Sequence, residues 1–332
     1  MNEIHDEKPH IKKMRRMRAK LIFNPDAGAT RRSPIQMIDV IREMQAWKIV
    51  PEAFLVNEEW DLAGVVQEAL AQGIRLFVVC GGDGTIAAVA GMLLGTRATL
   101  GIIPSGTQNN IALSLGIPAE LPAAIALLRT GRRIKVDVGT AAWDKMTTPF
   151  LEVCSVGLGS ALFPAADDLL HGNLARIGDF LATLVTTQPA EIHLVLDNKQ
   201  EVRALGHGVL VANMPFTGLN YQVGARTAFS DGLLDVLLFA DLSKLDLLGY
   251  MFKGVGTDGS EDPRIQRYQV RRVDIDTQPA MPIMADGNVW GEGRMRIEVR
   301  RRALAVMVGE PAPETLPDPS PVSEAQTDAA TA

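Results

Sequence analysis

Short apolar runs alternate with amphipathic runs along roughly the first 135 residues of the chain. Four of the apolar runs are short, rich in aliphatic residues and followed by polar or glycine-containing segments, which predicts buried strands. Strands that alternate with helices predict an α/β domain with a mainly parallel sheet. The four predicted strands are Ala19–Phe23, Pro51–Val56, Leu76–Cys80 and Thr99–Ile103.

Helical periodicity and helix-end signals fill the segments between these strands. Ser33 and Pro34 predict an N-cap and first position of one helix, because Ser accepts hydrogen bonds there and Pro has the required backbone angle. Glycines close several of the other helical runs, as expected at helix C-termini. Those runs are Asp61–Gln72, Ile86–Leu93, Ile111–Leu115 and Leu121–Leu128.

The pattern changes after Val136, where we place a domain boundary. Short alternating segments follow, interrupted by helical stretches near 167–186 and 243–253, and they predict an antiparallel β-sandwich. The chain is thereby divided into a leader (1–18), an α/β domain (19–135), a β-sandwich domain (136–309) and a tail (310–332). The predicted strands are Phe150–Val156, Glu191–Leu196, Arg203–Ala212, Leu233–Phe239, Gln269–Ile275, Met295–Val299 and Ala303–Val308.

Charge separates the two ends of the chain. Residues 1–20 hold seven Lys or Arg and three Asp or Glu, whereas residues 310–332 hold five acidic and no basic residues. The tail composition predicts disorder. The basic run 12–18 is either a solvated leader or a patch for anionic lipid headgroups, at about 1 kcal/mol per cation. A net charge of −6 without interleaved aromatic and basic residues argues against nucleic-acid binding.

Two cysteines and the hydropathy pattern indicate the compartment. Cys80 and Cys154 lie in separate apolar runs and are expected to be buried thiols in a reducing environment. No apolar run approaches the roughly 18 residues of a membrane span, and no apolar segment follows the N-terminal charges as in a signal peptide. The sequence predicts a cytoplasmic protein.

The segment Gly81-Gly82-Asp83-Gly84-Thr85 lies between a predicted strand and a predicted helix. Free backbone N–H groups and a helix N-terminus favour a phosphate at such a turn. The carboxylate of Asp83 would repel a phosphate unless a metal ion or a hydroxyl mediates, which indicates a nucleoside triphosphate handled with Mg²⁺. The alternative is a tight turn whose glycines serve only positive φ angles.

Two further polar loops follow predicted strands. Asn24-Pro25-Asp26-Ala27-Gly28 comes after the first strand, and Pro104-Ser105-Gly106-Thr107-Gln108-Asn109-Asn110 comes after the fourth. Open parallel sheets bind their ligands beyond the carboxyl ends of the strands. The three loops are therefore expected to form one site.

These motifs together resemble the diacylglycerol kinase catalytic-domain family, which includes bacterial lipid kinases and the sphingosine and ceramide kinases and shares its nucleotide domain with NAD kinases. The resemblance extends through Asn213, Ala228–Val236 and Ala285-Asp286-Gly287, and it covers about residues 19 to 308. It implies a nucleotide domain followed by a β-sandwich, with the active site in the cleft between them.

The resemblance also implies roles for individual residues. Asp83 would bind Mg²⁺, and Asp286 would be the general base that accepts the proton of a lipid hydroxyl. Asp231, with the carbonyls of Ala228 and Leu233, would hold a second, structural Mg²⁺, an ion that suits hard oxygen ligands. The residues expected to contact ATP are Asn24, Gly81, Gly82, Gly84, Thr85, Gly106, Thr107 and Asn109.

Amides replace two carboxylates that the family usually has. Asn110 stands where Asp follows the third motif, and Asn288 stands where Glu follows the Asp-Gly pair. The loss of two negative charges would weaken metal binding, and Glu292 is a candidate to compensate. If so, Asn110→Asp with Asn288→Glu should raise activity. Leu113 also replaces a frequent Arg of the third motif.

Three functions remain open from the sequence. The first is an ATP- and Mg²⁺-dependent lipid kinase that phosphorylates diacylglycerol, a sphingoid base or a related lipid at the inner membrane surface, with peripheral membrane contact. The second is a non-catalytic lipid or nucleotide sensor with a weakened metal site. The third is a kinase of a soluble substrate such as NAD. The sequence leaves a homodimer open and does not name the lipid.

Overall fold

A computed structural model of the chain describes residues 14–28, 34–57, 61–157, 188–217, 221–223, 228–240, 242–243, 246 and 264–309. The helical elements are α1 (Met37–Ala46), α2 (Leu62–Ala71), α3 (Asp83–Leu93), α4 (Asn110–Ser114), α5 (Leu121–Thr130) and the 3-10 turn η2 (Ala228–Ser230). The strands of the first half are β1 (Met17–Phe23), β2 (Ile49–Leu55), β3 (Leu76–Gly81), β4 (Thr99–Pro104), β5 (Arg132–Trp143), β6 (Met146–Phe150) and β7 (Val153–Gly157). Those of the second half are β8 (Ala190–Leu196), β9 (Gln200–Ala212), β10 (Phe216–Thr217), β11 (Tyr221–Gln222), β12 (Leu234–Ala240), β13 (Ile265–Val270), β14 (Arg272–Gln278), β15 (Pro282–Ala285), β16 (Asn288–Glu292) and β17 (Met295–Val308).

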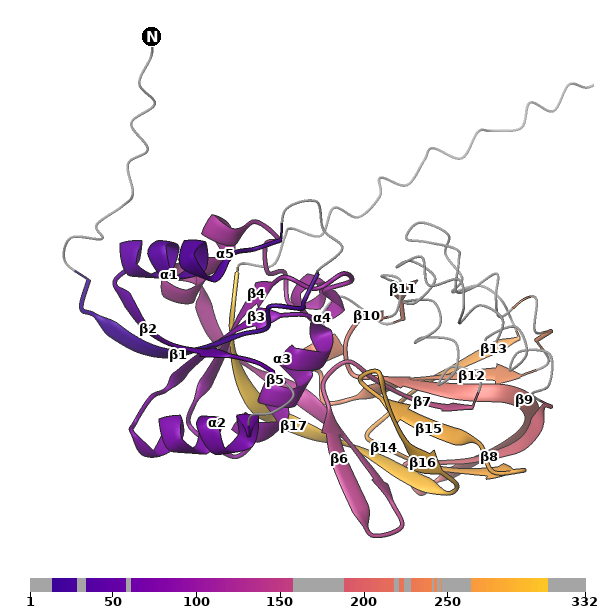
Figure 1. The fold of residues 1–332 in the computed structure, drawn as a ribbon. Coiled ribbons are helices and arrows are strands. Elements are labelled where there is room, and N and C mark those ends of the chain that lie inside the picture. The colour runs from indigo at the N-terminus through magenta and orange to yellow at the C-terminus, as the bar shows by residue number, and fades with distance from the viewer. Residues whose placement is uncertain are drawn as a thin grey trace, which may run out of the picture.

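The N-terminal half is an α/β domain with a parallel sheet, as the sequence predicts. Its strands lie in the order β4-β3-β1-β2, and every adjacent pair is parallel. Helices α1 and α5 cover one face and α2 and α3 the other (Figure 1). All three predicted ligand loops therefore leave the same edge of the sheet.

Neighbouring residues of these strands face opposite sides of the sheet, so two apolar cores form. Ile22 and Val79 pack with α2 and α3, whereas Leu21 and Val78 pack with α1 and α5. The alternation follows from the period of two along a strand. Because both faces are covered, the strands are almost continuously apolar, as expected for a parallel sheet.

The C-terminal half is an antiparallel β domain, in agreement with the prediction. Its main sheet runs in the order β16-β15-β7-β9-β8-β14-β17, and β12 joins it beside β9 and carries β13. Cys154 is buried in this half and Cys80 in the parallel sheet, and both are free thiols, as expected.

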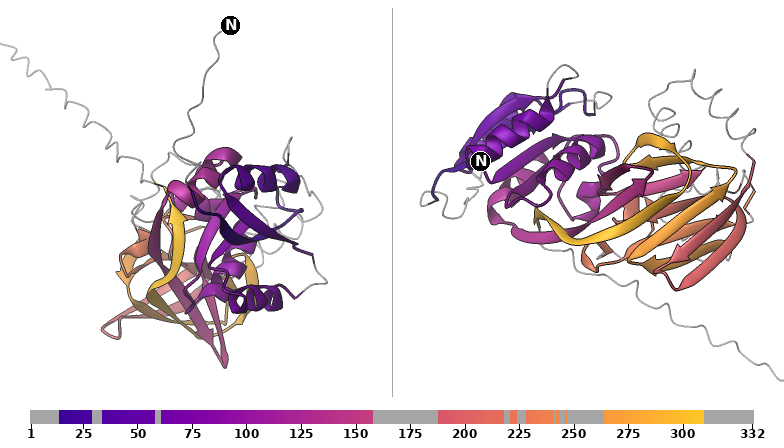
Figure 2. Two further views of the ribbon diagram at one scale, coloured as in Figure 1. Left: turned by 90° about the vertical axis from the view of Figure 1, so that its left-hand side faces the viewer. Right: turned by 90° about the horizontal axis from the view of Figure 1, so that it is seen from below.

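Strands β5 and β17 connect the two halves. They pair with each other over nearly their whole length, and Val306 of β17 also pairs with Leu100 of β4 in parallel. Figure 2 shows β17 (yellow) passing from the β domain to the α/β domain. Val136 lies inside β5, which runs on without a break. Long shared strands of this kind fix the two sides of a site relative to each other.

Several predicted elements differ from the observed ones. The first helix begins at Met37 rather than Pro34, because Gln36 is still extended and its carbonyl starts the helical hydrogen bonds. The predicted strand Gln269–Ile275 is two strands, because the side chain of Asp197 accepts the N–H groups of Arg271 and Arg272 at the break. The predicted strands Met295–Val299 and Ala303–Val308 are one strand, β17, with an irregularity between them.

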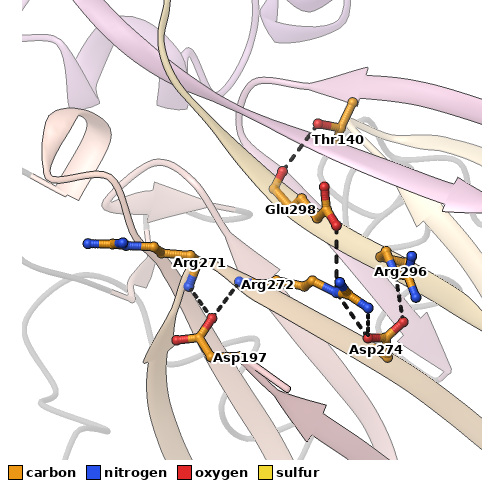
Figure 3. Close-up of polar contacts among 7 residues, drawn as sticks. All are labelled: Thr140, Asp197, Arg271, Arg272, Asp274, Arg296 and Glu298. Atoms are coloured by element: carbon orange, nitrogen blue, oxygen red, sulfur yellow. Dashed lines mark hydrogen bonds and ion pairs between the residues drawn. The ribbon is translucent and has the colours of Figure 1, made fainter. Parts of the chain in front are cut away.

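Strands β14 and β17 are also tied by a group of charged side chains (Figure 3). Asp274 accepts hydrogen bonds from Arg272 (2.9 Å) and Arg296 (2.8 Å), and Arg272 also pairs with Glu298. Burial opposes ionisation of Asp274, but the two guanidinium groups outweigh it and lower the pKa of this carboxyl. The group therefore stabilises the sheet at neutral pH.

Some expectations fall outside the described residues. These are residues 1–13 of the basic leader, the predicted N-cap Ser33, the helical stretch 167–186, most of 243–253 and the tail 310–332. Within the part of the chain that is described, no helix is both long and apolar enough to cross a membrane.

Candidate active site

The first loop of the site is joined to the second by Asn24. Its backbone N–H donates to the carbonyl of Cys80 at 2.9 Å, and its Nδ2 donates to Oγ1 of Thr85 at 2.8 Å. Asn24 therefore fixes both the end of β1 and the hydroxyl of the second loop. The structure brings these two predicted residues together.

The second loop enters its helix earlier than the sequence indicates. Helix α3 begins at Asp83, with Gly82 in an extended conformation at the N-cap, so Gly84 and Thr85 belong to the first helical turn. A Cβ on Gly81 would lie 3.0 Å from Cβ of Thr85, so a larger residue there would press on that side chain. The loop and the first turn of α3 thus present free N–H groups at a helix N-terminus.

The third loop packs directly on the second. A Cβ added to Gly106 would lie 2.5 Å from Cα of Gly82. Asn109 holds this loop in shape, because its Oδ1 accepts the N–H of Gly106 at 2.9 Å and its Nδ2 donates to the Gly106 carbonyl at 2.8 Å. Asn109 itself has a left-handed backbone with φ +56°. Thr107 is exposed on the same loop.

Asp83 links α3 to α4. Its Oδ2 accepts the N–H of Asn110 and its Oδ1 accepts that of Ile111, both at 3.0 Å. Burial raises the pKa of Asp83, although these backbone hydrogen bonds act in the opposite direction. The carboxylate thus lies beside the N-terminus of α4 in surroundings that disfavour its charge.

Asp286 lies in the turn between β15 and β16, where its backbone φ is +43°. Its Oδ2 accepts the N–H of Leu151 at 2.6 Å, and its Oδ1 accepts those of Glu152 (2.9 Å) and Val153 (3.0 Å). These hydrogen bonds use the backbone N–H groups where β6 ends and β7 begins. They explain why the predicted strand Phe150–Val156 is interrupted there.

The surroundings of Asp286 shift its ionisation. Burial, with a smaller contribution from the negative charge of Asp83, raises the pKa of Asp286 to about 6 against the three backbone hydrogen bonds. Burial and the charge of Asp286 also raise the pKa of the Cys154 thiol, which stays neutral. A carboxyl with a pKa near 6 is ionised at neutral pH yet retains substantial basicity.

Asp83 and Asp286 come from the two halves of the chain and are close enough for their charges to interact. Two such carboxylates fit Mg²⁺, which is commonly bound by one or two carboxylates together with substrate phosphates and water. Within the described ranges, no three His, Cys, Asp or Glu side chains are grouped so as to hold a metal ion. A cation held by these two carboxylates would take its other ligands from substrate phosphates and water.

The second predicted metal position is at Asp231, which follows the 3-10 turn η2. Oδ1 of Asp231 accepts the N–H of Leu233 at 2.9 Å in a local turn after Ala228–Ser230. Burial raises the pKa of Asp231, opposed by the Leu233 hydrogen bond, and the charge of Asp137 adds to the rise. Asp137 is fully buried and accepts the N–H groups of Gly232 and Arg302, each at 2.6 Å.

Glu152 and Asp137 are polar residues that the motifs do not identify. Both interrupt apolar runs, Phe150–Cys154 and Val136–Val138, and an acidic residue inside an apolar strand pattern is the signal that could have found them. Asn213 supports both segments, since its Nδ2 donates to the carbonyls of Asp137 and Leu151. Buried polar groups with several partners of this kind specify one local arrangement.

The residue proposed to compensate for the missing carboxylates does not lie at the site. Glu292 is exposed and pairs with Pro282, at the opposite end of the β15–β16 hairpin from Asp286. Asn288 is exposed and its Nδ2 donates to the carbonyl of Asp286 at 3.3 Å. Leu113 is exposed on α4.

Comparison with known proteins identifies the family. Residues 18–141 match the diacylglycerol kinase catalytic domain, and residues 153–308 match the YegS C-terminal NAD kinase beta sandwich-like domain. A probable lipid kinase YegS-like protein of Pseudomonas aeruginosa (strain UCBPP-PA14) is 30% identical over 259 residues, which cover 75% of this chain and 82% of that protein.

One further relative and one solved structure are also similar to this chain. A diacylglycerol kinase of Mycobacterium tuberculosis (strain CDC 1551 / Oshkosh) is 28% identical over 69% of this chain and 75% of its own. A solved structure of a putative diacylglycerol kinase from Bacillus anthracis has the same fold, with a TM-score of 0.69 and 23% identity over 88% of this chain and 97% of that one. The chain belongs to the diacylglycerol kinase catalytic-domain family and is a kinase.

Proposed function

We propose that this kinase transfers the γ-phosphate of ATP to a hydroxyl group of a lipid, such as diacylglycerol or a sphingoid base. The observation that carries the proposal is that Asp83 and Asp286, one from each half of the chain, lie close enough for their charges to interact, with Asp83 in the first turn of α3. Phosphoryl transfer needs bound phosphates, neutralised charge and a base beside the acceptor hydroxyl.

The phosphates of ATP would lie against Gly81, Gly82, Gly84 and Thr85 at the N-terminus of α3. Helix N-termini stabilise phosphate through free N–H groups and the helix dipole. Asn24 orients the Thr85 hydroxyl, and the loop of Gly106, Thr107 and Asn109 packs against Gly82 and would close the other side.

Asp286 would accept the proton of the lipid hydroxyl as the hydroxyl oxygen attacks the γ-phosphorus and the bond to the β,γ-bridging oxygen breaks, with ADP as the leaving group. The three N–H groups that bind its carboxylate fix its orientation, and a pKa near 6 leaves it ionised at pH 7. Asp83 would hold Mg²⁺, which supplies charge neutralisation at the phosphates when bound. Asp231, with the carbonyls of Ala228 and Leu233, would hold a second, structural Mg²⁺.

We propose peripheral contact with a membrane through two hairpins. Met146, Val289 and Trp290 are apolar and 53%, 62% and 43% exposed; we call them the hairpin patch. The rings of Trp290 and Trp143 lie 6.0 Å apart, and Met146 pairs with Trp143 across the β5–β6 hairpin, which projects from the body (Figure 1). Tryptophan favours the membrane–water interface, and Val289 and Trp290 follow Asp286 closely in sequence.

Phosphate transfer from labelled ATP with Mg²⁺ tests the proposal. The acceptors are diacylglycerol, ceramide and sphingosine in mixed micelles, with NAD as a soluble acceptor. We expect transfer to one lipid class and none to NAD. Transfer only to NAD would identify a soluble-substrate kinase, and ATP binding without any transfer would identify a sensor; either result would overturn the proposal.

A further inference from the structure

Glu152 occupies the bend between β6 and β7 and is 7% exposed. Its backbone N–H donates to Asp286, and its carbonyl accepts the N–H groups of Asn213 (2.9 Å) and Met214 (3.3 Å). The bend is thus fixed on both sides of the residue. A carboxylate held at such a buried place requires hydrogen-bond donors.

Asn110 supplies one of these donors from the other half of the chain. Its Nδ2 donates to Oε1 of Glu152 at 3.0 Å, in a buried contact. Its backbone N–H meanwhile donates to Asp83. A continuous series of hydrogen bonds therefore runs from Asp83 through Asn110 and Glu152 to Asp286.

Resting on the function proposed above, we propose that Glu152 is a positioning residue that supplies the negative charge missing at position 110. The carboxylate of Glu152 is hydrogen-bonded to the amide of Asn110. The contact therefore still holds one negative charge, which lies on residue 152 and not on residue 110. Glu152 is not a metal ligand here; it acts through Asn110 and through the charge it adds next to Asp83 and Asp286.

This arrangement reverses the expectation for Asn110→Asp. In the natural background the new carboxylate would face Glu152 at about the 3.0 Å of the present hydrogen bond, without a proton between them. Like charges this close in buried surroundings repel strongly. In the Glu152→Gln background the same substitution would restore a hydrogen bond, because the amide then stands at position 152 and can donate to the carboxylate at position 110.

Four proteins form the test: the natural chain, Asn110→Asp, Glu152→Gln and the double variant. Thermal melting in EDTA measures the contact without any ligand. Calorimetric titration with Mn²⁺ in the presence of ATP measures the metal site without turnover. Steady-state transfer, with kcat and KM for Mg-ATP separated, measures the consequence for activity.

We expect opposite effects of Asn110→Asp in the two backgrounds. Alone it lowers the melting temperature by several degrees, whereas added to Glu152→Gln it leaves melting close to that of the natural chain. Glu152→Gln alone weakens Mn²⁺ binding about 10-fold or more, the range for residues that orient metal ligands. We expect the double variant to regain most of the Mn²⁺ affinity, and its KM for Mg-ATP to return toward that of the natural chain.

Equal effects of Asn110→Asp in both backgrounds would overturn the inference, as would unchanged Mn²⁺ affinity in Glu152→Gln. Melting and Mn²⁺ binding do not depend on the acceptor. The four proteins could show the expected melting and Mn²⁺ binding while the natural chain phosphorylates no lipid. That result would contradict the proposed function but would support the proposed role of Glu152 beside Asn110.

Discussion

Gly82 and Gly106 lie backbone against backbone where the second and third loops of the site meet. A Cβ on Gly106 would come within 2.5 Å of Cα of Gly82, a distance that side-chain rotation cannot relieve, since the obstructing atom is backbone. The two loops keep their spacing only with glycine at this place. Glycine is needed here for close approach and not for a positive φ angle.

Gly106→Ala should therefore separate the two loops. We expect a loss of stability of about 1–3 kcal/mol, the usual cost of overpacking, and weaker ATP binding. Thermal melting and calorimetric titration with ATP measure the two effects. Gly84→Ala is the matched control for stability, because a Cβ there meets nothing within 4 Å. Equal melting temperatures of the two variants would contradict the packing argument.

Asp83→Asn should separate catalysis from folding. The amide retains one oxygen that can accept an N–H from α4, so we expect a stability loss of only about 1 kcal/mol. Turnover with Mg-ATP should fall about 100-fold or more, because the charge beside the phosphates is lost. Asp39→Asn is a control on the exposed face of α1. Turnover near that of the control would remove Asp83 from the metal site.

Asp286 should impose a pH dependence on stability in EDTA. Its folded pKa of about 6 exceeds the ordinary 3.8, so the folded state binds more protons between these values. Its contribution to the free energy of unfolding therefore decreases as pH rises through that window. Asp286→Asn should remove this decrease, so the stability difference, variant minus natural chain, should rise from pH 4 to 6 and level off above. A pH-independent difference would contradict the raised pKa.

The hairpin patch should contribute to membrane contact. Val289→Ser with Trp290→Ser should reduce binding to phosphatidylglycerol vesicles severalfold, because both side chains would lose apolar contact with the bilayer. Sedimentation with vesicles measures it. Leu205→Ser is the matched control, since Leu205 is 54% exposed on β9 and outside the patch. An equal loss of vesicle binding in Leu205→Ser would contradict a specific role of the hairpin patch.

The parallel half of the fold could be predicted from the sequence because its apolar runs are uniform and its turns carry glycine. The β half was harder to divide into strands. The break at Arg271 depends on the side chain of Asp197, which is distant in sequence, and the interruption after Phe150 depends on Asp286. Hydrogen bonds between distant residues leave no local pattern.

The approach of the three loops to one another could also be predicted, since Asn24 contacts Thr85 and Gly106 lies against Gly82. Glu152 stands out in the sequence only as an acidic residue within an apolar run; its role could not be predicted, because that role arises from Asn110 and Asp286, which reach it only in the folded chain. The position of Glu292 could not be predicted either. Its distance from Asn288 in the sequence does not show that the hairpin carries it away from Asp286.

The rate of phosphate transfer from ATP to the preferred lipid, compared between Asp286→Asn and Asp274→Asn, tests the central claim most directly. Asp274 pairs with Arg272 and Arg296 away from the site, so its variant should lose roughly 1–3 kcal/mol of stability at neutral pH but keep its rate per folded molecule. Asp286→Asn should lower the rate about 100-fold or more. A rate for Asp286→Asn close to that of Asp274→Asn would contradict Asp286 as the base.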